Sequence, residues 1–261
     1  MKQIVKVIYV LLLGVLVFFS CGGIKDNKEK LQATQNQLII TSEGDSVENG
    51  FWSYNKDINS LSQKGTYEDG YKIDKWTYIV NGDSVNTRWS IINYKGVTFN
   101  FPDYFKRIHN TKPPVLFQAD IEDNDDNTYL VLLRYDLTEI KSSVYDYLYQ
   151  YNDSWKNNNE ETLKSKEFKK FYFKNIEIFQ AKVQTKREIN YEAVSYCFVV
   201  NNFLYDLTYK NAVSKNSAIG LEIFNDILYS MKCENVDLFD YNSRKYLKEE
   251  NIEFKRSSSL N

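Results

Sequence analysis

The sequence predicts an α+β protein in which antiparallel sheets are covered by packed helices. Alternating apolar residues separated by turn residues predict strands, and two stretches with apolar residues at helical spacing predict helices. Their order along the second half of the chain is strands, helix, strands, helix, which favours an antiparallel α+β layer. The composition of the 261 residues, 43% hydrophobic and 26% charged, excludes collagen-like, disordered and disulfide-scaffold classes. The net charge of -2 argues against a nucleic-acid partner, because such domains are strongly basic.

The N-terminus reads as a targeting segment. Lys2 and Lys6 precede Val7–Phe19, an uncharged run of 13 residues. A helix that crosses the hydrocarbon layer needs about 20 residues, whereas this length suits the apolar region of a signal peptide. The alternative is a short membrane anchor that happens to contain a cysteine. The run ends in Ser20-Cys21-Gly22.

This junction resembles the signals of bacterial lipoproteins, in the relaxed form found in Bacteroidetes, with Phe18 where leucine is usual. The resemblance implies a signal peptide over 1–20 and a lipid attachment site at Cys21, acylated with palmitate-type chains. Several acyl chains anchor a protein stably to a membrane. The polar stretch 21–37 would be a tether, and the protein would lie in the cell envelope, on the periplasmic side or at the cell surface.

Two further cysteines, Cys197 and Cys233, belong to the folded part. An envelope compartment is oxidising, so the two could form a disulfide. They could equally be buried free thiols that pack as small hydrophobic groups. The sequence leaves both alternatives open.

The segment 38–95 is expected to be a module of β-hairpins. Glu68-Asp69-Gly70 and Asn81-Gly82-Asp83 stand between apolar runs, and Asp-Gly and Asn-Gly pairs are strong hairpin signals. Gly50-Phe51-Trp52-Ser53-Tyr54 is echoed by Asp74-Lys75-Trp76-Thr77-Tyr78. This pattern resembles MORN-type repeats, and the MORN-like proteins of bacteria that are often named as antitoxins. Trp52 and Trp76 are candidates for a partner-binding surface, although tryptophans at repeat spacing more often form core.

The segment 96–233 is expected to fold as a second module, joined to the first around Lys95-Gly96 and able to fold alone. Ser143 and Asp146 fit a helix capping box. A last helix is expected from about Ser217 to Lys232, and the tail 234–261 is expected to dock in part through Leu238, Phe239, Tyr241 and Tyr246. The predicted strands lie at 97–101, 115–121, 129–135, 162–168, 176–187, 191–200 and 203–209, with a tight turn at Asn201-Asn202.

The opening phrase of this module, Val97-Thr98-Phe99-Asn100-Phe101-Pro102-Asp103-Tyr104-Phe105, resembles the start of the PsbP family. That family shares its fold with a Ran-binding nuclear import factor and with the bacterial lipoprotein DcrB. The resemblance spans Gly96 to about Cys233. It implies a PsbP-like antiparallel sheet with packed helices, and a protein that binds or scaffolds other proteins without catalysis.

No catalytic, metal or cofactor site is expected from the sequence. His109 is the one histidine and reads as a surface-loop residue. The acidic cluster of Asp120, Asp123, Asp125 and Asp126 lacks the mid-loop glycine and the later glutamate of a calcium loop. It reads as the tip of a hairpin. No phosphate-binding or dinucleotide fingerprint occurs, and no small-molecule ligand is indicated.

The expected function is therefore that of a lipid-anchored envelope protein that binds or scaffolds a protein partner. Two alternatives remain. One is an immunity or antitoxin-like inhibitor, which rests on the MORN-like resemblance. The other is an envelope hydrolase that uses paired carboxylates, which sequence alone does not exclude.

We predict that Cys21→Ser blocks lipidation, because the thiol is the acyl acceptor. The variant should stay unprocessed or lack acyl chains, and mass spectrometry of the native N-terminus should find a lipid adduct on Cys21. A mature chain that starts elsewhere and carries no lipid would contradict the assignment.

Overall fold

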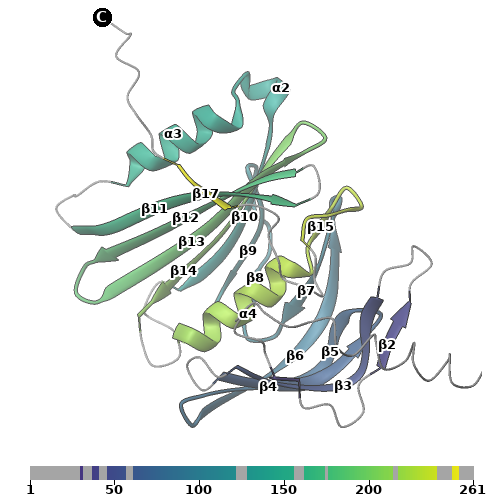
Figure 1. Cartoon of the computed structure of the whole chain (residues 1–261). Helices are drawn as coiled ribbons and strands as arrows, with labels where there is room; N and C mark the ends of the chain where they lie inside the picture. The colour runs from purple at the N-terminus through teal and green to yellow at the C-terminus, as the bar shows by residue number, and fades with distance from the viewer. Residues whose placement is uncertain are drawn as a thin grey trace, which may run out of the picture.

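The computed structural model describes residues 30–31, 37–40, 46–56, 61–121, 128–155, 162–173, 176–213, 217–239 and 249–252. Two antiparallel sheets and two longer helices make up this part of the chain (Figure 1). The α+β expectation is thereby confirmed in its coarse form. The lipoprotein junction at Cys21 and the acidic residues Asp123, Asp125 and Asp126 lie outside the described residues.

The N-terminal sheet is mostly a meander of hairpins, in the strand order β1-β3-β4-β5-β6-β7-β15-β16, with β2 paired to β3. Its strands are β1 (Lys30–Leu31), β2 (Gln37–Ile40), β3 (Ser46–Lys56), β4 (Leu61–Glu68), β5 (Tyr71–Val80), β6 (Asp83–Tyr94), β7 (Val97–Pro102), β15 (Lys232–Cys233) and β16 (Val236–Asp237). Asp69, Gly70, Asn81 and Gly82 have positive φ. The predicted hairpin turns at these pairs are therefore present.

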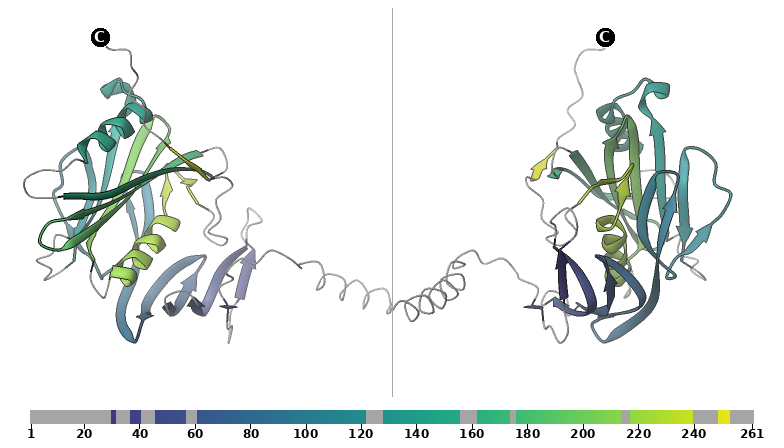
Figure 2. Two further views of the ribbon diagram at one scale, coloured as in Figure 1. Left: turned by 60° about the vertical axis from the view of Figure 1, so that its left-hand side comes forward. Right: turned by 90° about the vertical axis from the view of Figure 1, so that its right-hand side faces the viewer.

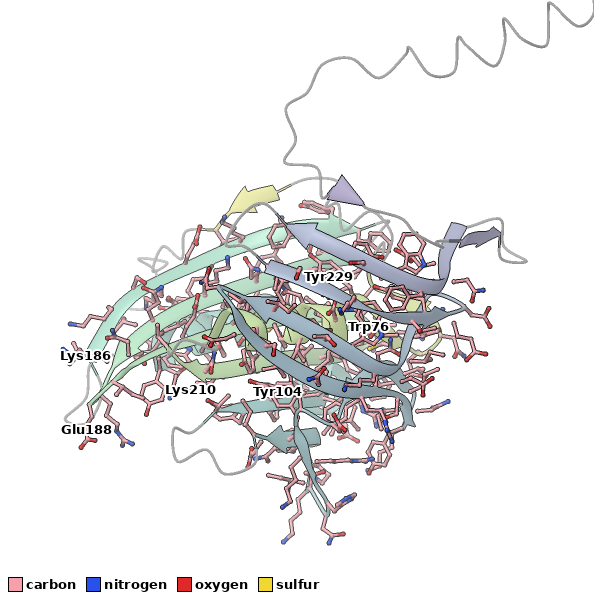
Figure 3. The ribbon with its side chains drawn as sticks, turned by 90° about the horizontal axis from the view of Figure 1, so that it is seen from below. Trp76, Tyr104, Lys186, Glu188, Lys210 and Tyr229 are labelled. Carbon is pink, nitrogen blue, oxygen red and sulfur yellow. The ribbon has the colours of Figure 1, made fainter. Side chains whose placement is uncertain are left out.

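The C-terminal sheet has the order β17-β11-β12-β13-β14-β10-β9-β8, all antiparallel. Its strands are β8 (Lys106–Ile108), β9 (Val115–Asp120), β10 (Tyr129–Asp136), β11 (Thr162–Phe173), β12 (Ile176–Lys186), β13 (Asn190–Val200), β14 (Phe203–Ala212) and β17 (Glu249–Asn251). Asn201 and Asn202 both have positive φ in the turn between β13 and β14, as predicted. Lys186 and Glu188 mark the projecting tip of the β12–β13 hairpin (Figure 3).

Three helices are described: α2 (Leu137–Ile140), α3 (Val144–Ser154) and α4 (Ser217–Tyr229). Ser143 caps α3, and both hydrogen bonds of the predicted capping box with Asp146 are present. Helix α4 buries its apolar residues Ile219, Ile223, Phe224, Ile227 and Leu228. It ends at Tyr229, before the predicted Lys232. The chain leaves the helix because Lys232 and Cys233 pair with Thr98 and Val97 of β7. Leu238 and Phe239 of the expected tail are buried.

Helix α4 lies between the two sheets, packed on β14 of one and on β5 and β7 of the other (Figures 1 and 2). Helix α3 covers the opposite face of the C-terminal sheet. Successive side chains along a strand point to opposite faces of the sheet, so neighbouring residues of β12 and β13 show which helix lies on each face. Ile178 and Phe198 belong to the large core with α4, whereas Phe179 and Cys197 pack with Leu148 of α3.

The expected boundary at Lys95-Gly96 falls on a hairpin turn inside the N-terminal sheet. Strand β6 pairs with β7 along its length, from Tyr94 opposite Val97 to Trp89 opposite Pro102. One continuous hydrophobic core includes residues of both sheets, from Trp52 to Phe239. The two predicted modules thus share a sheet, a helix and a core.

We predict that a fragment beginning at residue 94 does not unfold cooperatively. Removal of β3–β6 would expose the side of α4 that packs on β5 and would leave the buried Asp226 without its partner Lys72. Loss of one member of a buried ion pair costs about 3–5 kcal/mol. Urea unfolding followed by near-ultraviolet circular dichroism compares the fragment with the full chain. A sharp transition for the fragment would instead support two independent modules.

Candidate functional site

Trp52 and Trp76 are core residues, with 4% and 0% of their surface exposed. Each indole N–H donates to a nearby carbonyl, that of Trp52 to Asn49 O at 2.9 Å and that of Trp76 to Thr66 O at 3.0 Å. Neither ring is exposed to a partner in the folded chain. Both tryptophans are therefore core residues. They do not form the partner-binding surface for which the sequence made them candidates.

Trp76 packs in the interior against Gly65 and Lys72. A Cβ added at Gly65 would lie 2.3 Å from the Trp76 ring, so the glycine permits this close approach. The ammonium of Lys72 lies 3.8 Å from the centroid of the same ring. Figure 3 shows Trp76 on the N-terminal sheet where that sheet passes over α4.

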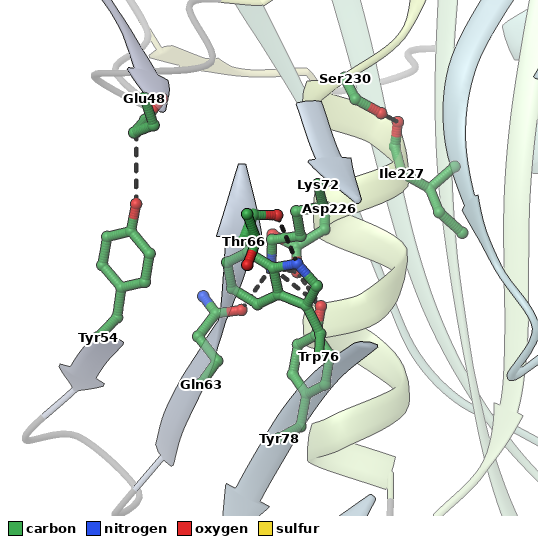
Figure 4. Close-up of polar contacts among 10 residues, drawn as sticks. All are labelled: Glu48, Tyr54, Gln63, Thr66, Lys72, Trp76, Tyr78, Asp226, Ile227 and Ser230. Carbon is green, nitrogen blue, oxygen red and sulfur yellow. Dashed lines mark hydrogen bonds and ion pairs between the residues drawn. The ribbon is translucent and has the colours of Figure 1, made fainter. Parts of the chain in front are cut away.

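Lys72 and Asp226 form a fully buried ion pair at the centre of this layer (Figure 4). Lys72 Nζ donates to Asp226 Oδ2 at 2.6 Å and to Gln63 Oε1 at 2.7 Å. It also lies 2.9 Å from the hydroxyl of Tyr78, which donates to Asp226 Oδ2 at 2.7 Å. The pair joins β5 to α4, and its hydrogen bonds meet the requirement that a buried charge be paired.

Aromatic rings surround the ammonium group. Its distances to ring centroids are 4.9 Å for Tyr78, 5.6 Å for Trp89 and 6.0 Å for Tyr67, besides the close contact with Trp76. Rings at such distances stabilise a cation and exclude water. The site is thus a dry ammonium–carboxylate pair in an aromatic enclosure.

A second buried polar cluster holds α3 on the C-terminal sheet. The hydroxyl of Tyr147 donates to Asp206, and that of Tyr151 lies 2.5 Å from Ser195 Oγ. Ser195 is linked to Thr208 at 2.6 Å, and Thr208 donates to Asp206 at 2.9 Å. The helix is therefore fixed by hydroxyl groups as well as by its single buried apolar residue, Leu148.

Burial raises the pKa of the Asp206 carboxyl, and hydrogen bonds from Tyr147, Thr208 and Cys197 oppose that rise. Burial also raises the pKa of the Cys197 thiol, with the nearby Asp206 adding to the effect. A thiol of raised pKa stays protonated and is a poor nucleophile. The cluster is therefore suited to positioning α3.

Helices α2 and α3 carry three exposed large apolar residues, Ile140, Tyr145 and Tyr149. Their exposed fractions are 43%, 47% and 39%. Tyr145 also packs edge-on against Phe179 of the sheet, 5.3 Å between centroids. The two tyrosines are four residues apart and so share one side of the helix. We call these three residues the α2–α3 patch.

The two cysteines of the folded part form no disulfide. Cys197 and Cys233 are buried and free, which agrees with the expectation of buried thiols. They belong to different apolar clusters, one beneath α3 and the other in the large core. His109 is exposed and lies outside the described strands and helices, as predicted. Asp120 lies in β9.

Within the described ranges, no group of three or more histidine, cysteine, aspartate and glutamate side chains is arranged to hold a metal ion. Among the same residues, no helix has the length and apolar character needed to cross a membrane.

The comparisons with known proteins identify no family. No protein-family model matches the sequence, and no curated protein matches it. Among solved structures, the chain is similar to the solution structure of the cyanobacterial PsbP protein CyanoP from Synechocystis sp. PCC 6803. The TM-score is 0.42 and the identity 12%, over 56% of this chain and 92% of that one.

A second similar structure is a putative regulator of unknown function, PA94 from Pseudomonas aeruginosa. Here the TM-score is 0.29 and the identity 10%, over 51% of this chain and 90% of that one.

We predict that the free energy of unfolding falls as pH rises above about 4, and that Asp206→Asn removes this fall. Because the pKa of Asp206 is raised in the fold, the native protein keeps a proton that the unfolded chain releases above pH about 4. The stability that this proton gives is complete below that pH and is lost as pH rises through the raised native pKa. The neutral amide should remove this decline and still accept from Tyr147.

Urea unfolding across that pH range measures the effect, at about 1.4 kcal/mol per pKa unit. Asp83→Asn, at an exposed position of β6, is the control and should keep the slope of the native sequence. Equal slopes in all three proteins would show that Asp206 does not titrate as its burial implies.

Proposed function

We propose that this chain is a lipid-anchored protein of the cell envelope that binds another envelope protein without catalysis, through the α2–α3 patch. The observation that supports this most is the exposure of Ile140, Tyr145 and Tyr149 within the short segment of α2 and α3. Tyrosine gives a large, rigid contact area and is enriched at protein interfaces. The proposal moves the expected binding surface from Trp52 and Trp76 to α3.

The patch is held rigidly enough to act as a preformed surface. The capping box fixes the start of α3, and Tyr147 and Tyr151 tie it to the sheet beneath. A surface that is ordered before binding loses less entropy on association. A partner that meets it would bind with little rearrangement.

Charges beside the patch restrict the chemistry of the partner. Glu139, Asp146 and Asp153 are exposed on α2 and α3, against Lys141 on the same segment and Lys166 of β11, which donates to Asn152 O of α3. The partner surface should therefore combine apolar side chains with lysine or arginine, because complementary charge speeds encounter and excludes acidic surfaces.

Three finer features belong to the same proposal. Lipidation at Cys21 would anchor the chain, with 21–37 as its tether. The segment 38–95 would be a MORN-like hairpin module, supported by the meander β3–β6, and 96–233 would be PsbP-like. A toxin as the bound partner would make the protein an immunity or antitoxin-like inhibitor.

The arrangement of buried acids favours binding over hydrolysis by paired carboxylates. Asp206 faces α3 and Asp226 belongs to α4, so these two of the buried carboxylates lie on opposite sides of the C-terminal sheet. Each is engaged in its own hydrogen-bond cluster, and the third buried acid of the described residues, Glu48, accepts from the hydroxyl of Tyr54. A glycosidase-type pair would need its carboxyl groups within about 10 Å across one open site.

We predict that a photo-cross-linking amino acid placed at Tyr149 in the full, membrane-bound chain yields a discrete adduct with one envelope protein in intact cells. Tyr145→Ser combined with Ile140→Ser should reduce that adduct at least about tenfold, since truncating the central anchor residues of an interface costs more than about 1 kcal/mol each. High salt should weaken it.

The same cross-linker placed at Ile91, which is exposed on β6, is the matched control and should give no such adduct. Equal adducts from both positions would contradict the assignment to α3. Reproducible hydrolytic turnover that one carboxylate substitution abolishes in a folded protein would replace binding by catalysis.

A further inference from the structure

We propose that Lys72 and Asp226 condense to an intramolecular amide bond, with Tyr78 carrying the proton that the reaction must move. The bond would join β5 to α4 covalently. This inference rests on the buried ion pair alone and is independent of the partner-binding surface on α3.

The fold places the two groups together. Lys72 Nζ lies 2.6 Å from Asp226 Oδ2, the oxygen bonded to the carbon that would be attacked, and neither side chain has any exposed surface. Well-oriented groups within one molecule reach effective concentrations of up to about 10⁵–10⁸ M. Condensation is thereby a reaction between two groups that the fold already holds together.

Hydrogen bonds also orient the amine. The ammonium group donates to Gln63 Oε1, the Tyr78 hydroxyl and Asp226 Oδ2. When the proton toward Oδ2 crosses to the carboxylate, the nitrogen lone pair that it leaves behind points at Oδ2, one bond away from the Cγ atom that it attacks once the carboxyl group turns. Gln63 and Tyr78 keep the amine from turning away.

The pair is also shielded from bulk water. Trp76, Trp89 and Tyr67 surround the nitrogen and are themselves buried. Burial disfavours the charged forms of both groups, whereas their mutual attraction and the aromatic rings favour them, so the neutral amine and carboxylic acid are the minor form from which the reaction proceeds. Exclusion of water also protects the product amide from hydrolysis.

The step balances without any other reactant. The Nζ lone pair attacks Cγ of the protonated carboxyl and forms the Nζ–Cγ bond. A second proton passes from Nζ to the Tyr78 oxygen while Tyr78 gives its own proton to Oδ2, along contacts of 2.9 and 2.7 Å. The Cγ–Oδ2 bond breaks and one water leaves, so ammonium and carboxylate become an amide and the phenol is restored.

The bond would change how the protein responds to unfolding and proteolysis. Lys72 and Asp226 are 154 positions apart in the chain, and a cross-link over so long a loop restricts the unfolded state strongly. The N-terminal sheet and α4 would stay attached after denaturation. Such a closure suits a protein exposed outside the cytoplasm.

Mass spectrometry of the purified, denatured full-length protein tests the proposal. The chain should be lighter by the mass of one water than its Lys72→Arg variant, after allowance for the substitution. Trypsin should release a branched peptide that joins residues 65–75 to residues 216–232, with no cleavage after Lys72. Finding only the two linear peptides would overturn the proposal.

The branched peptide is the deciding observation, because a succinimide at Asp226 would also remove one water but would stay linear. A water loss confined to the linear peptide 216–232 therefore also overturns the proposal. The test needs only the native sequence, so it holds even if Lys72→Arg fails to fold.

Two variants examine the proton route and the site. Tyr78→Phe keeps the ring but removes the hydroxyl, and should slow bond formation by about a hundredfold or more, followed as the branched fraction after synthesis. Lys75→Arg, on the exposed side of the same strand, should leave that fraction unchanged. Unchanged formation in Tyr78→Phe would overturn the route through Tyr78.

Discussion

The buried ion pair of Lys72 and Asp226 is the constraint around which the rest of the structure is arranged. An ammonium group without contact with water must have a partner, because leaving either charge unpaired in the interior costs several kcal/mol. The partner comes from α4, far along the sequence. The N-terminal sheet and α4 must therefore pack on each other for either to be stable.

This constraint explains where the aromatic residues go. The chain contains 21 tyrosines, 16 phenylalanines and 4 tryptophans, and many of the large rings line the space between the N-terminal sheet and α4. They shield the ion pair, and Tyr78 and Trp76 also contact the ammonium directly. The aromatic repeat of residues 50–78 thus builds the interior of the sheet, which is why Trp52 and Trp76 face no partner.

Local features were predictable from the sequence, whereas the central contact was not. The Ser143–Asp146 cap, the asparagine turn and the apolar face of α4 each depend on residues within a few positions of one another. Lys72 follows a turn in an alternating strand and reads as a solvent-exposed position. Asp226 lies next to Ile227 and three residues after Ile223, on the apolar side of the helix. An acid in such a position implies a buried partner, and this was the one indication of the ion pair in the sequence.

The two faces of the C-terminal sheet differ in the way they hold their helices, and this difference bears on function. Helix α4 is fixed by a large apolar core on both sides and by a buried charge. Helix α3 is fixed by a small apolar cluster and by hydroxyl contacts to Asp206 and Ser195. Hydrogen bonds depend on angle as well as on distance, so these contacts fix the orientation of α3 although its apolar cluster is small. The binding surface proposed on α3 is thereby ordered before a partner arrives, while α4 stays buried between the two sheets.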